Sequence, residues 1–443
     1  MPADVQKSQP LRVTSSDGFL LGLESLMRRD GQGRHLAATV LECEGAPDLE
    51  SISRMARDFG DRHPILQARV ARGRDWIARW RVDEVVAAAI PVEIWHLPGA
   101  CGNGTEIASL DELIDRCING DDIDIFKPGP NLKLHVIVLS PDRWALVIAW
   151  SHSLLDAVGM TKLLQEFAGT AASPTGAIPE DEVSYSALYQ EAHPMIEEMR
   201  SFPGWRVRSL KRKGGRPGKC RFHVVNFDRE ASAAIRAKMA ETAGELLLLP
   251  YFASCAARAV RGVISARHPD EPASILLTLP VQRQKDPAKR PLFHNHMTAY
   301  MLLLTRDEMT DIRTASRALY RKYAGFIRRK LPAAMDALTR MMERCPSRLY
   351  NLPAFFYMKG EICSLFHSHT GSFLPGADHI FGSRVLNGYH VPSVCSPPGA
   401  GIFFSEHDGQ LSMTLSWKDG CLSPLELELM KETLAEDLGV AVP

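Results

Sequence analysis

The apolar positions of this 443-residue chain form short β-branched and aromatic runs, separated by segments in which apolar residues recur every three or four positions. The first pattern predicts buried strands, and the second predicts helices with one apolar face. In the first part of the chain, strands are predicted at residues 35–43, 65–71, 132–139 and 145–150, and a helix at 48–60. The last two strands flank the turn signal Ser140-Pro141-Asp142-Arg143, so they are expected to pair antiparallel.

The same alternation continues after residue 221. Further strands are predicted at residues 222–227, 275–280, 297–304, 401–405 and 411–417. Further helices are predicted at residues 229–242, 246–267, 311–331 and 423–438. Ser423 and Glu426 have the spacing of a capping box, which supports the start of the final helix.

Between the two parts lies a stretch of small residues and proline, residues 169–179, which is typical of a linker. We therefore expect two α/β halves, at residues 1–168 and 222–443, joined by a linker or crossover at residues 169–221.

Composition narrows the classes of function. The 52 basic residues balance 52 acidic ones, which argues against a nucleic-acid-binding protein. No apolar run reaches the about 20 residues of a membrane span, and the polar residues 1–10 lack the apolar core of a signal peptide. Nine cysteines without a CxxC pair favour reduced thiols, and we expect a cytoplasmic, monomeric protein.

The most informative candidate for chemistry is His152. It follows the apolar, strand-like residues 143–150, and Asp156 stands four residues later, where a helical spacing begins over residues 156–167. A histidine that titrates near neutrality can accept a proton from an attacking hydroxyl or amine. The same spacing also occurs by chance, and a buried histidine is often held by a backbone carbonyl, so the motif leaves both readings open.

Other segments, spread over nearly the whole chain, are similar to motifs of one superfamily. They are residues 13–20 with Glu24 and His35; residues 62–69 ("RHPxLR"); Phe126, Pro128, Gly129, Pro130 and Leu132; residues 279–283 with Asn295; and residues 367–371. In this order, and with His152 and Asp156 among them, the chain resembles the CoA-dependent acyltransferase superfamily with HxxxD active sites, which includes chloramphenicol acetyltransferase, peptide-synthetase condensation domains and plant BAHD enzymes. The resemblance is closest to the branch that contains wax ester synthase/diacylglycerol acyltransferase-like proteins.

The resemblance implies a mixed α/β fold of two chloramphenicol-acetyltransferase-like halves, which form a pseudo-dimer with an active-site tunnel between them. It implies transfer of an acyl group from acyl-CoA, as co-substrate, to an alcohol or amine. His152 would be the general base, with no covalent acyl-enzyme and no bound cofactor or metal. Asp156 would have a structural role and pair with Arg283, although Arg283 could equally be a surface residue of a polar loop.

The tetrahedral intermediate of such a transfer needs a hydrogen-bond donor for its oxyanion. The candidates in the matching segments are Ser151, Asn295, Ser368 and Thr370. The chain also departs from the superfamily. Ser151 replaces the first histidine of HHxxxDG, and Ala157 replaces its glycine. Gly244-Glu245 occupies the position of the Asn-Asp pair of the wax ester branch, and this last difference puts a lipid substrate in doubt.

Two basic clusters could bind the phosphates of CoA or be ordinary solvated loops. The first comprises Arg283, Lys285, Lys289 and Arg290. The second comprises Arg206, Arg208, Lys211, Arg212, Lys213, Arg216, Lys219 and Arg221, flanked by Phe202 and Trp205. This second loop could instead contact an anionic membrane surface or an acidic carrier protein.

Several alternatives remain at this stage. The chain could be a condensation-like enzyme that takes its donor from a phosphopantetheinyl carrier protein, or an inactive binding protein of the same fold. The HNH letters at residues 294–296 and the pair His367 and His369 lack the context of a nuclease or a metal site. The methionine-rich residues 331–366 suit core packing better than an acyl-chain site. Acyl-chain length, acceptor identity and the choice between oxygen and nitrogen are open.

Overall fold

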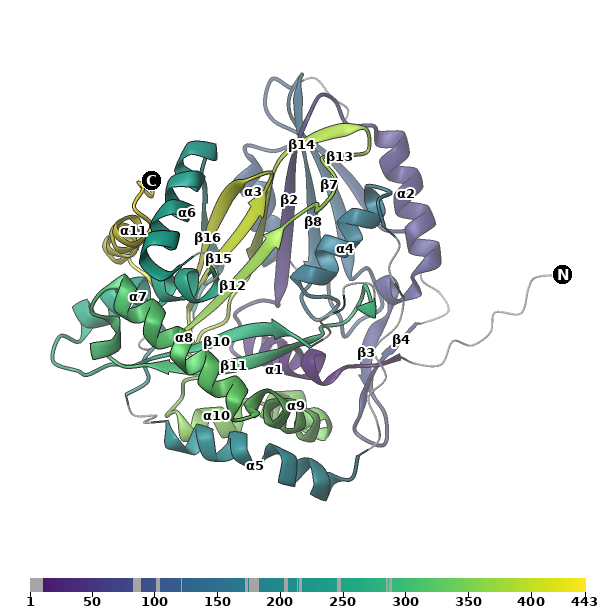
Figure 1. Cartoon of the computed structure of the whole chain (residues 1–443). Coiled ribbons are helices and arrows are strands. Elements are labelled where there is room, and N and C mark those ends of the chain that lie inside the picture. Colours follow the sequence, from purple (N-terminus) through teal and green to yellow (C-terminus); the bar gives the residue numbers. More distant parts are fainter. Residues whose placement is uncertain are drawn as a thin grey trace.

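The fold is that of a computed structural model of the chain. It describes residues 11–82, 89–100, 104–120, 122–171, 174, 183–202, 206–212, 214, 217–244, 248–283, 286 and 289–443. Two large sheets and the helices that cover them make a mixed α/β architecture (Figure 1). This architecture confirms the predicted fold class.

The first large sheet has seven strands, in the spatial order β13-β14-β2-β8-β7-β5-β6. Their bounds are β2 Leu36–Glu44, β5 Val92–His96, β6 Thr105–Glu106, β7 Leu132–Ser140, β8 Arg143–Ser151, β13 His379–Ile380 and β14 Ser383–Pro392. Strands β7 and β8 pair antiparallel across the predicted turn, which confirms that hairpin. Every residue of β8 after Arg143 is buried, as its unbroken apolar run predicts.

The second large sheet has six strands, in the order β11-β10-β12-β15-β16-β9. Their bounds are β9 Cys220–Asn226, β10 Ile275–Gln282, β11 Met297–Leu304, β12 Leu365–Ser372, β15 Ala400–His407 and β16 Gln410–Lys418. A small third sheet joins β1 Leu11–Arg12, β4 Ala78–Arg81 and β3 Arg69–Arg72.

Helices flank the two sheets (Figure 1). Their bounds are α1 Ser15–Arg29, α2 Leu49–Arg62, α3 Leu110–Asn119, α4 Ala157–Phe167, α5 Tyr185–Ser201, α6 Arg229–Ala243, α7 Leu248–Arg267, α8 Ile312–Arg328, α9 Leu331–Met341, α10 Leu352–Tyr357 and α11 Pro424–Leu438. Single 3₁₀ turns occur at Pro64–Gln67, Asp307–Met309, Met342–Arg344 and Ser347–Leu349. Helices α6, α7 and α11 lie beside the second sheet, and α2 and α4 lie beside the first. The capping box at Ser423 and Glu426 is present, as predicted.

One local prediction was wrong. The predicted strand at residues 65–71 is a 3₁₀ turn followed by the short strand β3, because Pro64 starts a turn before the chain extends. The predicted helix at residues 311–331 is α8, which ends earlier, at Arg328. Lys330 has a φ of +55°, and Pro332 has no N–H with which to continue the hydrogen bonds of α8, so a separate helix, α9, begins at Leu331.

The sheets do not follow the two halves of the chain. Strand β14 belongs to the predicted second half, yet it pairs with β2 of the first, with Val391 opposite Ala38. The second half therefore completes the sheet that carries His152. Of the predicted linker at residues 169–179, the structure describes only 169–171 and 174.

The methionine-rich segment is mostly packed. Leu338 and Met341 of α9 pack against α5, where Leu188 and Ala192 are buried. This agrees with core packing for α9, whereas Leu349, Leu352, Phe356 and Tyr357 are exposed. Within the described ranges, no helix combines the length and apolar character that crossing a bilayer requires.

Candidate active site

His152 lies in the short connection between the end of β8 and the start of α4. The local sequence makes this connection tight, because Asp156 is the N-cap of α4 and its carboxylate accepts a hydrogen bond from the Gly159 amide at 2.9 Å. The backbone of His152 is held from two sides. Its N–H donates to the His35 carbonyl at 3.1 Å, and its carbonyl accepts from Asn295 Nδ2 at 3.0 Å.

The His152 ring is partly buried between two aromatic neighbours. Its plane stacks on that of His35, with centroids 4.9 Å apart and an interplanar angle of 15°, and the Trp150 ring is 5.2 Å away. Nδ1 of His152 is buried and has no hydrogen-bond partner among the described residues. Burial lowers the pKa of His152, and the charges of Asp156 and Asp17 only partly oppose that effect. The imidazole is therefore neutral at pH 7 and able to accept a proton.

Asp156 faces away from solvent and is fully engaged. Its carboxylate forms an ion pair with Arg290 and also accepts from the His296 amide at 3.2 Å and Gln282 Nε2 at 3.4 Å. Burial raises the pKa of Asp156, but the charge of Arg290 and the hydrogen bonds from Gly159 and His296 outweigh it and lower the pKa overall. Asp156 is thus an ionised structural anchor.

Two predictions about the arginines were wrong. Arg283 does not pair with Asp156; it contacts Ser15 Oγ at 3.0 Å and Asp336 at 3.2 Å. The reason is strand alternation, because Gln282 at the end of β10 points toward Asp156 and the next side chain points the opposite way. Arg290 takes the place beside Asp156 instead. Since it is only 1% exposed, it is not available for CoA phosphates.

The contact between Asp156 and Arg290 also depends on Gly159. A Cβ at this position would lie 2.6 Å from the Leu292 carbonyl oxygen. The glycine therefore lets the segment that carries Arg290 approach α4. The sequence shows a glycine three residues after Asp156, but no nearby residue indicates that it packs against Leu292.

A second buried network connects the opening motif, which comprises residues 13–20 with Glu24 and His35, to His152. Asp17, on α1, is 0% exposed and lies 2.8 Å from His294 Nδ1, 2.8 Å from the Asn295 amide nitrogen and 2.8 Å from Asn295 Nδ2. Both hydrogens of Asn295 Nδ2 are therefore used, one by Asp17 and one by the His152 carbonyl. Asn295 holds the His152 loop and has no hydrogen left for an oxyanion, so that predicted role is corrected.

The opening motif contributes two further contacts. Glu24 accepts a hydrogen bond from the His35 backbone amide, which sets the position of the ring stacked on His152. Thr14 Oγ1 donates to the Asn295 carbonyl at 3.0 Å. The residues named by the motif therefore support His152 through its neighbours.

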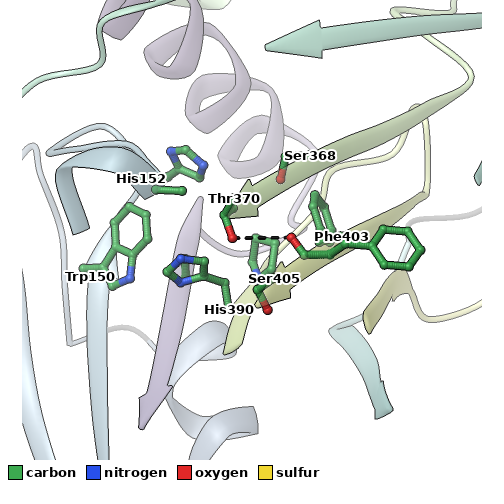
Figure 2. Close-up of a pocket in the computed structure, with 11 residues that line it drawn as sticks. Trp150, His152, Ser368, Thr370, His390, Phe403 and Ser405 are labelled. Carbon is green, nitrogen blue, oxygen red and sulfur yellow. Dashed lines mark hydrogen bonds between the residues drawn. The ribbon is translucent and has the colours of Figure 1, made fainter. Parts of the chain in front are cut away.

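A small cavity of about 60 Å³ lies between the two large sheets and reaches His152. It is lined by Ala37, Trp150, His152, Ala157, Ser368, Thr370, His390, Pro392, Phe403, Phe404 and Ser405. Figure 2 shows Trp150, His152 and His390 on one side, with Ser368 and Phe403 on the other. The first side comes from the seven-stranded sheet and the second from the six-stranded sheet. Ala157 also borders this space.

The remaining oxyanion candidates differ in position. Ser368 and Thr370 line the cavity, and the Thr370 hydroxyl donates to the Phe404 carbonyl at 3.4 Å. Ser151 is buried at the end of β8 and is not among the described residues that line the cavity. His390, on β14, was not identified from the sequence, because it lies outside every segment that matches a motif.

Several of the described basic candidates form ion pairs with acidic side chains. Lys289 is exposed, with Asp286 at 3.8 Å. In the second cluster, Arg208 pairs with Glu271 and Lys211 with Glu361, both at 2.8 Å. Lys285, Trp205, Lys213, Arg216 and Glu245 lie outside the described residues.

The comparisons with known proteins concern the fold. No family model and no curated protein matches this sequence. Among solved structures, TRI3 trichothecene 15-O-acetyltransferase from Fusarium sporotrichioides is 12% identical and has a TM-score of 0.68, with 97% of this chain and 95% of that one covered. The first condensation domain of the calcium-dependent antibiotic synthetase is 13% identical, with a TM-score of 0.65 and coverage of 98% and 96%.

A third similar structure is the starter condensation domain of rhizomide synthetase RzmA in complex with C8-CoA and Leu-SNAC. It is 12% identical, with a TM-score of 0.63 and coverage of 98% of this chain and 94% of that one. At these identities the likeness establishes a shared fold over nearly the whole chain.

Proposed function

We propose that this protein is an acyltransferase that moves an acyl group from acyl-CoA to an alcohol or amine. The observation that carries the proposal is a neutral imidazole, His152, held through its backbone on both sides and bordering a cavity between two sheets. A base in this setting can serve a nucleophile that enters the same cavity as a thioester.

In the proposed reaction, the hydroxyl or amine of the acceptor attacks the thioester carbonyl while His152 Nε2 takes its proton. The tetrahedral intermediate then collapses, the C–S bond breaks, and the protonated imidazole returns the proton to the leaving thiolate. No acyl-enzyme forms. Asp156 and Arg290 maintain the shape of the loop, and Ser368 is a candidate donor to the oxyanion.

The similar structures support this chemistry without assigning it. One is named as an O-acetyltransferase, and another is a condensation domain in complex with C8-CoA and Leu-SNAC. The likeness to condensation domains also favours a second candidate function, in which an acyl-phosphopantetheinyl carrier protein supplies the donor. A third candidate, an inactive binding protein, rests on the departures at Ser151 and Ala157.

Other predictions from the sequence accompany this proposal. The protein is predicted to be a cytoplasmic monomer that divides at residues 168 and 221 and is related to the wax ester synthase-like branch. Lys285 and Lys289 are predicted to bind the phosphates of CoA, and the second basic cluster is predicted to contact a membrane or a carrier protein.

The decisive experiment measures thiol release from a panel of acyl-CoAs against alcohols and amines. We expect His152→Ala to lower turnover by about 10²-fold or more, which is the range that general-base catalysis contributes. His193→Ala is the matched control, because His193 lies on α5 and is half-exposed. Retained turnover in the folded His152→Ala protein would overturn the proposal. Release only from an acyl-carrier protein would favour the second candidate, and binding of acyl-CoA without release from any donor the third.

A further inference from the structure

His390 lines the cavity beside Trp150 and His152, although it comes from the second half of the chain (Figure 2). It is 6% exposed. Its Nδ1 lies 2.9 Å from Thr39 Oγ1, and its Nε2 is buried with no hydrogen-bond partner among the described residues. A buried ring nitrogen without a partner, on a residue that lines a cavity, calls for an explanation, and a hydrogen bond made only to a bound ligand supplies one.

The hydrogen bonds around Thr39 determine which nitrogen of His390 carries the hydrogen. Trp150 Nε1 donates to Thr39 Oγ1 at 3.0 Å. The Thr39 hydroxyl has one hydrogen of its own, and within the described part of the chain its only other partner is His390 Nδ1. If Nδ1 accepts this hydrogen, His390 Nε2–H is the single unsatisfied group. The other tautomer would leave both the hydroxyl and Nε2 unsatisfied, so the Nε2–H form is favoured.

His390 is also uncharged and held in place. Burial and, to a smaller extent, the neighbouring His152 lower its pKa to about 3. The His390 carbonyl accepts from Thr414 Oγ1 at 2.8 Å, and its ring packs 4.4 Å from that of Phe373. A neutral donor has a specific advantage here, because it does not repel the positive charge that His152 gains when it takes a proton.

We propose that His390 is a further catalytic residue, whose Nε2–H donates a hydrogen bond to the carbonyl oxygen of the bound acyl thioester and to the oxyanion formed from it. This proposal rests on the acyl-transfer function above and assigns its oxyanion donor. Trp150 and Thr39 are positioning residues, since they act through the tautomer of His390. A donor fixed before the substrate arrives stabilises the intermediate without reorganisation of the site.

The test measures binding, so it does not require the acceptor to be known. The probes are two dethia-CoA analogues with a methylene in place of sulfur, one a methyl ketone with the carbonyl of acetyl-CoA and the other the alkane without it. By titration calorimetry, the native protein should bind the ketone about tenfold more tightly than the alkane. His390→Phe should abolish this preference, and His390→Gln, which keeps an N–H donor, should restore part of it. Thr39→Val should weaken the preference through the tautomer.

The assignment would be overturned if folded His390→Phe kept the full preference for the ketone over the alkane. It would also be overturned if both His390 variants lost this preference completely while Thr39→Val kept it unchanged. Failure of the native protein to bind either analogue would overturn the acyl-CoA donor itself, and the proposal for His390 with it. Circular dichroism and thermal unfolding of each variant distinguish loss of the hydrogen bond from loss of the fold.

Discussion

Asp156 and Arg290 form an ion pair in which the two side chains are 4% and 1% exposed. The pair joins the N-cap of α4 to the segment between β10 and β11, and so fixes the connection that carries His152 across the boundary between the sheets. Removal of one partner of such a pair leaves a buried charge without compensation.

We therefore expect Arg290→Ala to lower the free energy of unfolding by about 3–5 kcal/mol. Arg283→Ala is the matched control. Its side chain is 25% exposed and its ion pair with Asp336 is partly solvated, so the expected loss is about 1 kcal/mol. Urea unfolding of the two variants checks this order, and equal losses would contradict the assignment of Arg290 as the partner of Asp156.

Gly159 allows the close approach of that segment, so Gly159→Ala should be destabilising. The added Cβ would meet the Leu292 carbonyl oxygen at 2.6 Å, and we expect a loss of roughly 1–3 kcal/mol. Gly18→Ala on α1 is the control, because a Cβ there meets nothing within 4 Å. Chemical denaturation should show Gly18→Ala to be neutral or stabilising, and a loss of similar size at both positions would argue against the steric explanation.

The pH dependence of turnover should report His152. Burial lowers the pKa of His152 from its ordinary value of 6.5. A general base works only when deprotonated, so kcat/KM should rise with pH through this pKa and reach half its maximum below pH 6.5. A profile of thiol release from pH 4.5 to 8 checks the sign, and an acidic limb centred above pH 6.5 would contradict it.

Asn295 should act by holding His152 in position. Asn295→Ala removes the hydrogen bond to the His152 carbonyl, and we expect kcat to fall with little change in KM. Asn295→Asp should be worse in both turnover and stability, because it would place a second carboxylate within about 3 Å of Asp17 in a buried site. Steady-state kinetics and thermal unfolding of the two variants check the order. A more stable Asn295→Asp protein would contradict the network.

The periodicity of the sequence predicted most of the secondary structure, including the β7–β8 hairpin and the capped final helix. These features depend on residues close together in the chain, so local patterns reveal them. The helix predicted at residues 311–331 ends earlier, at Arg328, because helical periodicity continues past Lys330 and does not reveal the left-handed residue there. His152 and Asp156 were identified for the same local reason, since one strand end and one helix cap hold both.

What the sequence by itself determined is the strand, loop and helix that present His152. Only the tertiary structure decided which arginine meets Asp156, that Asn295 anchors the loop, and that β14 carries His390 into the same cavity. The physical reason is that these contacts join residues more than a hundred positions apart. Their geometry follows from how the two sheets pack and where β14 crosses, and no local pattern records either.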